Sequence, residues 1–63
     1  MSAVRVLLVD DAATVRAVMR RILSGVSGIQ VVGEAGNGAD GVELARRLRP
    51  DAVVMDLDMP GVD

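Results

Sequence analysis

Val4-Arg5-Val6-Leu7-Leu8-Val9-Asp10-Asp11 is the stretch of this sequence that decides its fold. The run from Val4 to Val9 is almost continuously apolar, and it stops abruptly at two aspartates. Such a run predicts a strand that is buried on both faces, as in the interior of a parallel sheet. The two acids then lie at the carboxyl end of that strand.

A helix and a second strand are predicted after the two aspartates. Residues 12–24 carry apolar side chains at helical spacing, and these predict a core-facing stripe of Val15, Val18, Met19 and Ile22. The basic residues of the same helix are expected on a solvated face, namely Arg16, Arg20 and Arg21. Residues 30–35 are more polar and contain a glycine, so we expect this strand at an edge of the sheet.

The remaining residues predict a second helix and a third strand. Asn37, within a Gly-Asn-Gly turn, is the expected N-cap of a helix that buries Val42, Ala45 and Leu48 and ends before Pro50. Residues 52–57 are again strongly apolar and predict the third strand. The alternation predicts an α/β fold of partial flavodoxin-like type, β-α-β-α-β, with three parallel strands in the spatial order 2-1-3.

This strand order brings acids from both ends of the chain together. Asp10 and Asp11 end the first strand and Asp56 lies near the end of the third, so their carboxylates should meet at the point where the connection reverses direction. Crowded carboxylates repel one another, and a hard cation such as Mg²⁺ relieves that repulsion. The sequence therefore points to a magnesium site, and a carboxylate neutralised by such a cation can also accept a phosphoryl group. The alternative, that these acids are ordinary turn residues, stays open at this point.

The composition excludes several other chemistries. The chain has 63 residues with no cysteine and no histidine, which excludes disulfides, thiolate zinc sites and imidazole catalysis. A net charge of −2 gives no electrostatic footprint for nucleic acid. No segment approaches membrane-spanning length, and the first apolar run leads into acids rather than a cleavage site. We therefore expect a cytoplasmic protein with no membrane contact.

Two stretches resemble the receiver domain of response regulators in two-component signalling. Residues 6–11 look like the opening of such a domain, and residues 56–63, Asp-Leu-Asp-Met-Pro-Gly-Val-Asp, look like its phosphorylation loop. The intervening Val32-Gly33-Glu34-Ala35, Asn37-Gly38 and Arg49-Pro50-Asp51 also match in place and spacing. The resemblance covers essentially the whole chain, so residues 1–63 are expected to form the first half of a receiver domain.

The resemblance implies a function and a set of site residues. Asp56 would accept phosphate from a phosphohistidine on a sensor histidine kinase or phosphotransfer protein. Asp11 and Asp56 would bind Mg²⁺ directly, Asp10 largely through water, and the backbone carbonyl of Asp58 would be a further ligand. The side chain of Asp58 would either tune the access of water or be a solvated loop acid. The chain would be a phosphoacceptor and not an enzyme.

A whole receiver domain has five strands, with a Ser or Thr after the fourth and a Lys after the fifth. This sequence reaches Asp63 without a fourth strand and contains no lysine. We therefore expect a domain truncated before that strand, with weak or transient phosphorylation, and nucleic-acid binding only through an absent output domain. The third strand would have a free edge, and two copies pairing these edges about a two-fold axis would be the simplest closed assembly.

Three other functions stay open from the sequence alone. Residues 36–41, Gly-Asn-Gly-Ala-Asp-Gly, match the dinucleotide-binding pattern, although they follow the second strand and leave Asp10 and Asp11 unexplained. Asp56-Leu57-Asp58 resembles the acid pair of aspartate-nucleophile phosphatases, although that pair normally follows a first strand. A non-catalytic interaction or oligomerising half-domain is the third.

Overall fold

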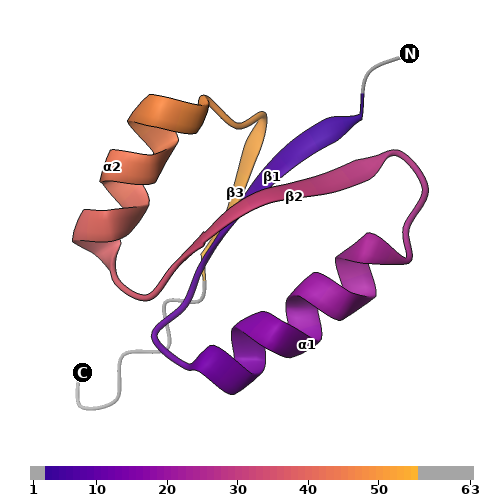
Figure 1. Cartoon of the computed structure of the whole chain (residues 1–63), viewed down its shortest axis with the longest axis horizontal. Coiled ribbons are helices and arrows are strands. Elements are labelled where there is room, and N and C mark those ends of the chain that lie inside the picture. The colour runs from indigo at the N-terminus through magenta and orange to yellow at the C-terminus, as the bar shows by residue number, and fades with distance from the viewer. Residues whose placement is uncertain (1–2, 56–63) are drawn as a thin grey trace, which may run out of the picture.

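Two helices alternate with three strands in the computed structural model of the chain, which describes residues 3–55 (Figure 1). The elements are β1 (Val4–Val9), α1 (Ala13–Ser24), β2 (Ile29–Ala35), α2 (Gly38–Leu48) and β3 (Ala52–Met55). The predicted β-α-β-α-β order is confirmed. The third strand was expected to reach Leu57, and that residue, like Asp56 and Asp58, lies outside the described residues.

The sheet has β1 at its centre. β1 pairs in parallel with β2 on one side and with β3 on the other, so the strand order is β2-β1-β3, as predicted. At the carboxyl end, Val9 is the partner of both Ala35 in β2 and Met55 in β3. The three strands therefore end at the same level of the sheet.

The apolar residues of β1 explain its central position. Val6, Leu7, Leu8 and Val9 are all buried, and the two leucines are 0% and 1% exposed. A strand with two hydrogen-bonded neighbours and a helix on each face leaves no side on which a polar residue would reach water. Figure 1 shows α1 and α2 on opposite sides of the sheet, which is the arrangement that right-handed crossovers on either side of β1 produce.

Asp51 sets the register between β1 and β3. Its backbone N–H donates to the carbonyl of Arg5 at 2.8 Å, and its carboxylate Oδ2 accepts from the backbone N–H of Arg5 at 2.8 Å. The side chain thus continues the ladder of hydrogen bonds just before β3 begins. This clamp at the amino end fixes which residues of the two strands lie side by side at the carboxyl end.

The predicted core stripe of α1 is wrong by one residue. Val15, Val18 and Ile22 are 37%, 57% and 61% exposed. Met19 is half-buried as predicted, and the other half-buried side chains of the helix are Arg16 and Leu23. Each lies at or one position after a predicted core residue, which corresponds to a rotation of the helix about its axis by one residue. Arg16 is turned toward the sheet on this face and makes the polar contacts described below.

The buried face of α2 also differs from the prediction at one position. Leu44, Ala45 and Leu48 pack against the core, whereas Val42 is 55% exposed. Gly41 takes its place on the buried face. A Cβ atom at Gly41 would lie 2.9 Å and 3.2 Å from the two γ-carbons of Val9, so the absent side chain lets α2 approach β1. The predicted N-cap is confirmed, because Asn37 Oδ1 accepts from the Asp40 N–H at 2.8 Å.

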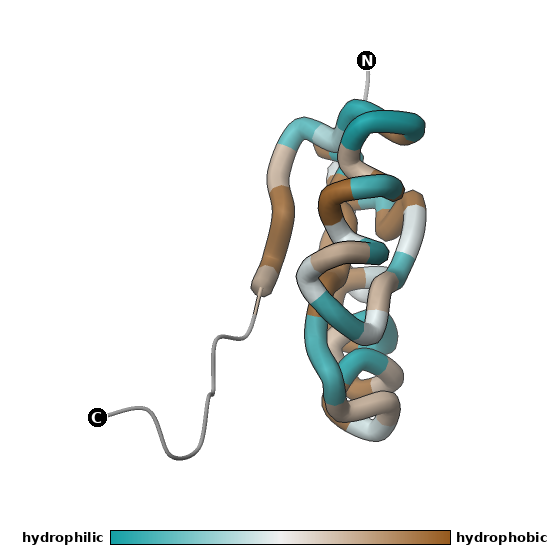
Figure 2. The backbone as a smooth tube through the Cα atoms, turned by 90° about the vertical axis from the view of Figure 1, so that its left-hand side faces the viewer, coloured by the Kyte–Doolittle hydropathy of each residue, from teal (hydrophilic) through white to brown (hydrophobic). Residues whose placement is uncertain are grey.

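β3 lies at the margin of the described molecule, and its side chains are more exposed than a buried apolar run suggests. Val53 and Met55 are 44% and 45% exposed. Figure 2 shows this apolar segment at one side of the molecule, where it forms an edge of the three-stranded sheet. Neither helix within residues 3–55 has the length and apolar character needed to cross a membrane.

The close contact between α2 and β1 yields a first prediction. A methyl group added against a stiff β-branched side chain costs about 1–3 kcal/mol, whereas replacing Gly by Ala in a helix gains at most about 1 kcal/mol. We therefore expect Gly41→Ala to lower the free energy of unfolding by about 1–2 kcal/mol in urea titrations followed by circular dichroism.

Gly38→Ala is the matched control for that variant. Gly38 opens the same helix, and a Cβ atom there would meet nothing within 4 Å. This variant should be neutral or slightly stabilising. Equal stability of the two variants would contradict the close approach of α2 to β1.

Candidate metal and phosphoacceptor site

The candidate site lies at the carboxyl edge of the sheet, where β1 and β3 end side by side. Asp10 and Asp11 follow β1 directly, and Val9 pairs with Met55, the last residue of β3. Asp56 is the next residue of the chain after Met55. The structure therefore brings together the two strand ends that the predicted acid cluster requires, while Asp56 and Asp58 themselves lie outside the described residues.

Asp10 is buried and held by three hydrogen bonds. Its backbone N–H donates to the carbonyl of Ala35 at 3.0 Å, which extends the ladder with β2. Its carboxylate Oδ1 accepts from the N–H of Ala12 at 2.8 Å, and its own carbonyl accepts from Nη1 of Arg16. The residue is 4% exposed, and within the described part of the chain its second carboxylate oxygen, Oδ2, has no hydrogen-bond partner.

Asp11 is placed differently from its neighbour. It lies in the bend between β1 and α1 and is exposed to solvent. The pair therefore consists of one rigid, buried carboxylate and one exposed carboxylate. This difference agrees with two separate functions, since only an exposed acid can reach a ligand outside the sheet without moving the strand.

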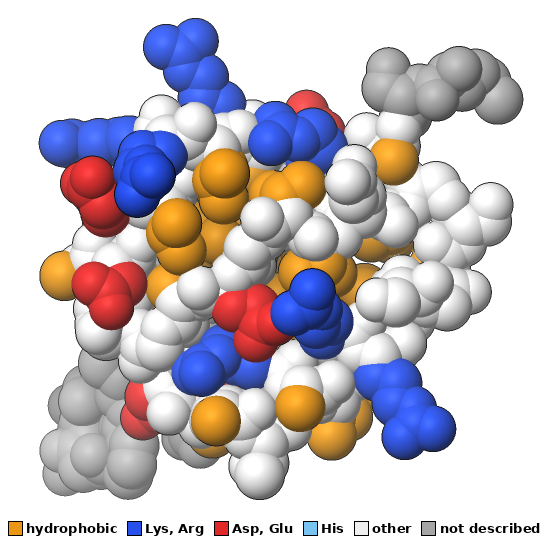
Figure 3. Space-filling view, in the orientation of Figure 1, with side chains coloured by type: hydrophobic (Ala, Val, Ile, Leu, Met, Phe, Trp, Pro, Cys, Tyr) orange, Lys and Arg blue, Asp and Glu red, His pale blue; other side chains and the backbone are white. Residues whose placement is uncertain are grey.

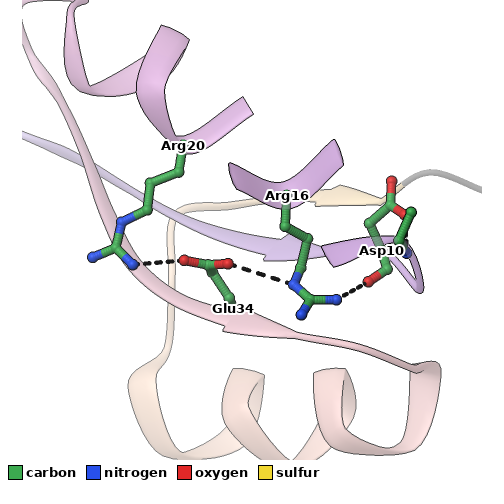
Figure 4. Close-up of polar contacts among 5 residues, drawn as sticks. Asp10, Arg16, Arg20 and Glu34 are labelled. Carbon is green, nitrogen blue, oxygen red and sulfur yellow. Dashed lines mark hydrogen bonds and ion pairs between the residues drawn. The ribbon is translucent and has the colours of Figure 1, made fainter. Parts of the chain in front are cut away.

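A network of charged side chains supports the Asp10 turn from the side of α1 (Figure 4). Arg16 Nε lies 3.4 Å from Glu34 Oε1, and Arg20 Nη1 lies 2.6 Å from Glu34 Oε2. The Arg16 side chain is 20% exposed, that of Glu34 25% and that of Arg20 60%. The expectation that Arg16 belongs to a solvated face is therefore wrong, because its guanidinium is turned inward between β2 and the end of β1.

Sequence reasoning missed Arg16 and Glu34 as residues of the site. Glu34 was a possible signal, because a carboxylate inside a strand that packs on a helix needs a partner. Arg16 is spaced along the helix like the other residues expected on the solvated face. Neither the spacing of the apolar residues nor the resemblance to receiver domains distinguishes it from them. Only the structure shows that its guanidinium reaches the carbonyl of Asp10.

The residues present are suitable ligands for a hard divalent cation. Carboxylate oxygens are the ligands that Mg²⁺ prefers. Asp10 Oδ2 is a buried carboxylate oxygen that accepts no hydrogen bond from the described residues. Residues 3–55 contain no group of three potential ligand side chains. A complete site would therefore need a third acid, and the predicted one, Asp56, follows directly from the neighbouring strand end.

The glycine-rich stretch 36–41 has a packing function in this fold. The Asp40 N–H at the start of α2 already donates to the side chain of Asn37, and Gly41 lies against Val9. The stretch follows β2, the edge strand, rather than the central strand from which α/β proteins bind dinucleotides. These contacts weigh against the dinucleotide-binding alternative.

Acidic and basic side chains are interspersed on the face of the molecule shown in Figure 3. Among the described residues on that face there is no continuous basic surface of the kind that binds the phosphate backbone of nucleic acids. The ion pairs among the described residues are those of Glu34 with Arg16 and Arg20.

Comparisons with known proteins point to one family. The family model of the response regulator receiver domain matches residues 6–63. The protein-glutamate methylesterase/protein-glutamine glutaminase 5 of Myxococcus xanthus (strain DK1622) is 48% identical over 62 residues, which cover 98% of this chain and 18% of that protein. The response regulator UvrY of Escherichia coli (strain K12) is 52% identical over 59 residues, which cover 94% of this chain and 27% of UvrY.

Solved structures give the same result. The response regulator domain of Thermotoga maritima CheB superposes with a TM-score of 0.86 at 41% identity and covers 97% of this chain. The signal receiver domain of Mycobacterium tuberculosis NarL superposes with a TM-score of 0.88 at 40% identity and covers all of it. This chain spans 46% and 51% of those two solved chains, about half of each.

The buried oxygen of Asp10 yields a second prediction. In the absence of divalent cations, a buried carboxylate oxygen without a donor destabilises the fold, and an amide of the same shape keeps the Oδ1 acceptor for the Ala12 N–H without the charge. We expect Asp10→Asn to raise the free energy of unfolding by about 1–2 kcal/mol in urea titrations with EDTA.

Asp11→Asn provides the comparison, because Asp11 is the exposed member of the pair. Its stability should lie within about 0.5 kcal/mol of the wild type. A loss of stability in Asp10→Asn would show that the buried carboxylate stabilises the fold and would contradict this description of the site.

Proposed function

Because this chain belongs to the response regulator receiver domain family, we propose that it is a phosphoacceptor module of a two-component response regulator, with Asp56 as the residue that receives the phosphoryl group. The observation that supports this most directly is the parallel pairing of Val9 with Met55. Asp10 and Asp56 are the next residues after that pair, so both acids start from the same level of adjacent strands.

The proposed metal site uses these acids. Asp11 and Asp56 would bind Mg²⁺ directly, Asp10 would bind largely through water, and the carbonyl of Asp58 would complete the protein ligands. The exposed position of Asp11 and the rigid, buried position of Asp10 agree with this division. When bound, the cation would offset negative charge on the phosphoryl oxygens during transfer.

The proposed reaction is transfer from a phosphohistidine of a sensor histidine kinase or phosphotransfer protein. A carboxylate oxygen of Asp56 attacks phosphorus, the P–N bond to the imidazole breaks, and the leaving nitrogen takes up a proton. The chain accepts the group once and turns over no substrate, so we assign it no enzymatic activity. Transfer from a kinase of this kind would take place in the cytoplasm, which is the location we propose for the chain. Any activity of a larger protein, including DNA binding, would reside in another domain.

Phosphorylation can be tested directly by intact mass spectrometry. The chain is incubated with a small phosphodonor and Mg²⁺, quenched rapidly and weighed. We expect a transient adduct of one phosphoryl group in the wild type and none in Asp56→Ala, because the acceptor oxygen is gone. Chelation of Mg²⁺ by EDTA should abolish the wild-type adduct.

Glu43→Gln is the control for nonspecific acyl phosphates, since Glu43 is an exposed carboxylate on α2. It should behave as the wild type. An adduct that survives in Asp56→Ala would reject Asp56 as the acceptor. Steady turnover of a phosphate ester by the wild type would favour an aspartate-nucleophile phosphatase instead.

A second proposal concerns self-association through β3. Within residues 3–55, β3 pairs with β1 alone, and its Val53 and Met55 side chains are 44% and 45% exposed. An apolar strand with a free edge is a template for another strand, and two copies can pair these edges about a two-fold axis.

Light scattering coupled to size-exclusion chromatography tests this pairing. We expect the fraction of dimer to rise with protein concentration. Val53→Lys should shift the equilibrium to monomer, because a charged side chain disfavours edge pairing. Val42→Lys, on α2 and 55% exposed, should leave the dimer intact. A wild type that stays monomeric at high concentration would refute the pairing.

A further inference from the structure

Arg16 connects three parts of the molecule that meet beside the acid pair. Its Nη1 donates to the backbone carbonyl of Asp10, its Nε faces the carboxylate of Glu34 in β2, and its backbone belongs to the first turn of α1. We propose that Arg16 is a positioning residue of the metal site, which fixes the direction of Asp11 by holding the peptide that joins the two acids. This inference rests on the proposed function, since it concerns the same site.

The bonded carbonyl is the reason that Arg16 acts on Asp11. The carbonyl of Asp10 and the nitrogen of Asp11 belong to one planar peptide unit, so an oxygen held in one direction also fixes the orientation of that nitrogen. Asp10 is already held by Ala35 and Ala12. With the peptide plane fixed as well, the exposed side chain of Asp11 starts from a defined backbone position.

Glu34 holds the guanidinium in place. The carboxylate lies between two arginines, 3.4 Å from Arg16 Nε and 2.6 Å from Arg20 Nη1. Gly36 leaves room for the guanidinium, because a Cβ atom there would lie only 3.4 Å from Arg16 Nη1. Arg16 Nε has no hydrogen-bond partner among the described residues, so its contact with Glu34 is an ion pair. The guanidinium, 20% exposed, makes its hydrogen bond through Nη1 to the Asp10 carbonyl.

The position of Arg16 in α1 argues against a role limited to helix stability. A cation in the first turn of a helix is unfavourable, because the N-terminus already carries partial positive charge. α1 has no acidic residue in its first turn that would offset Arg16. The anions that do so are Glu34 and the acid pair just outside the helix, so the arginine is explained by the site rather than by the helix.

The consequence for cation binding follows from the geometry. Loss of the guanidinium would free the Asp10–Asp11 peptide to rotate. The lost positive charge would by itself favour a cation, so the weaker binding expected here comes from the lost orientation of Asp11 alone. Residues that orient metal ligands without touching the metal typically change affinity about 10–100-fold when they are replaced. We expect the lower end of this range, about 10-fold, because Asp10 keeps its other two hydrogen bonds.

The experiment has two readouts on the full chain. The first is the ¹H–¹⁵N spectrum without divalent cations, in which the Asp11 amide reports the hydrogen bond on the carbonyl that precedes it. The second is the Mg²⁺ dissociation constant, obtained from titration of the same amide signals. The variants are Arg16→Gln, Arg16→Lys and Glu34→Gln, with Arg21→Gln as an exposed control on the same helix. Urea titrations of each variant give its folded fraction.

Arg16→Gln should shift the Asp11 amide and weaken Mg²⁺ binding about 10-fold while the chain stays folded. Glu34→Gln should do the same to a smaller extent. Arg16→Lys should recover part of the affinity, since an ammonium can still donate to one carbonyl. Arg21→Gln should match the wild type in both readouts.

Two results would overturn the role of Arg16, namely an unshifted Asp11 amide in Arg16→Gln, or a loss of affinity that merely follows the folded fraction. Should Arg16→Gln prove unfolded, an unshifted Asp11 amide in folded Glu34→Gln would overturn it equally. Failure of the proposed function has a different signature: the wild type itself would show no response to Mg²⁺. The amide shift in the metal-free chain still decides whether Arg16 holds the peptide.

Discussion

The central position of β1 is the constraint on which both the fold and the site depend. Its apolar residues are buried because β2 and β3 flank it and a helix lies on each side of the sheet. A parallel strand in that position must deliver its carboxyl end to the middle of the sheet edge. The acids that follow Val9 are therefore placed next to the end of β3, forty-six residues later in the chain, because Val9 and Met55 are paired.

The same position also has an electrostatic cost. The burial that stabilises the apolar residues of β1 also includes the next residue, Asp10, whose acidic side chain is 4% exposed. The fold relieves part of this cost with the Ala12 N–H at the start of α1 and with Arg16, which is held by Glu34. One oxygen of Asp10 is left without a donor among the described residues. A cation at this edge would relieve the remaining cost, so stability and function compete at one residue.

The strand order could be predicted from the sequence, because it depends on how apolar each strand segment is and on the alternation of strands with helices. Two strongly apolar runs, one more polar strand and the helices between them lead to a single topology. The helix faces were less predictable. Val15, Val18 and Ile22 share the apolar period of α1 and are exposed, whereas Arg16, a charged residue that no apolar period includes, is turned toward the sheet and bonds the Asp10 carbonyl. Gly41 takes the place of Val42 on the buried face of α2, because α2 and β1 approach too closely for a side chain there. The spacing of apolar residues in the sequence gives no information on that distance between helix and strand.

The central claim, that the ends of β1 and β3 form one cation site, is tested most directly by paramagnetic broadening. Mn²⁺ binds the same oxygen ligands as Mg²⁺, and it broadens the amide signals of residues near it. With substoichiometric Mn²⁺, the signals of residues 10–12 and 56–58 should broaden together, before those of the exposed acids on α2, Asp40 and Glu43. Excess Mg²⁺ should restore both groups. Broadening of only one group, or of all acids equally, would contradict a shared site.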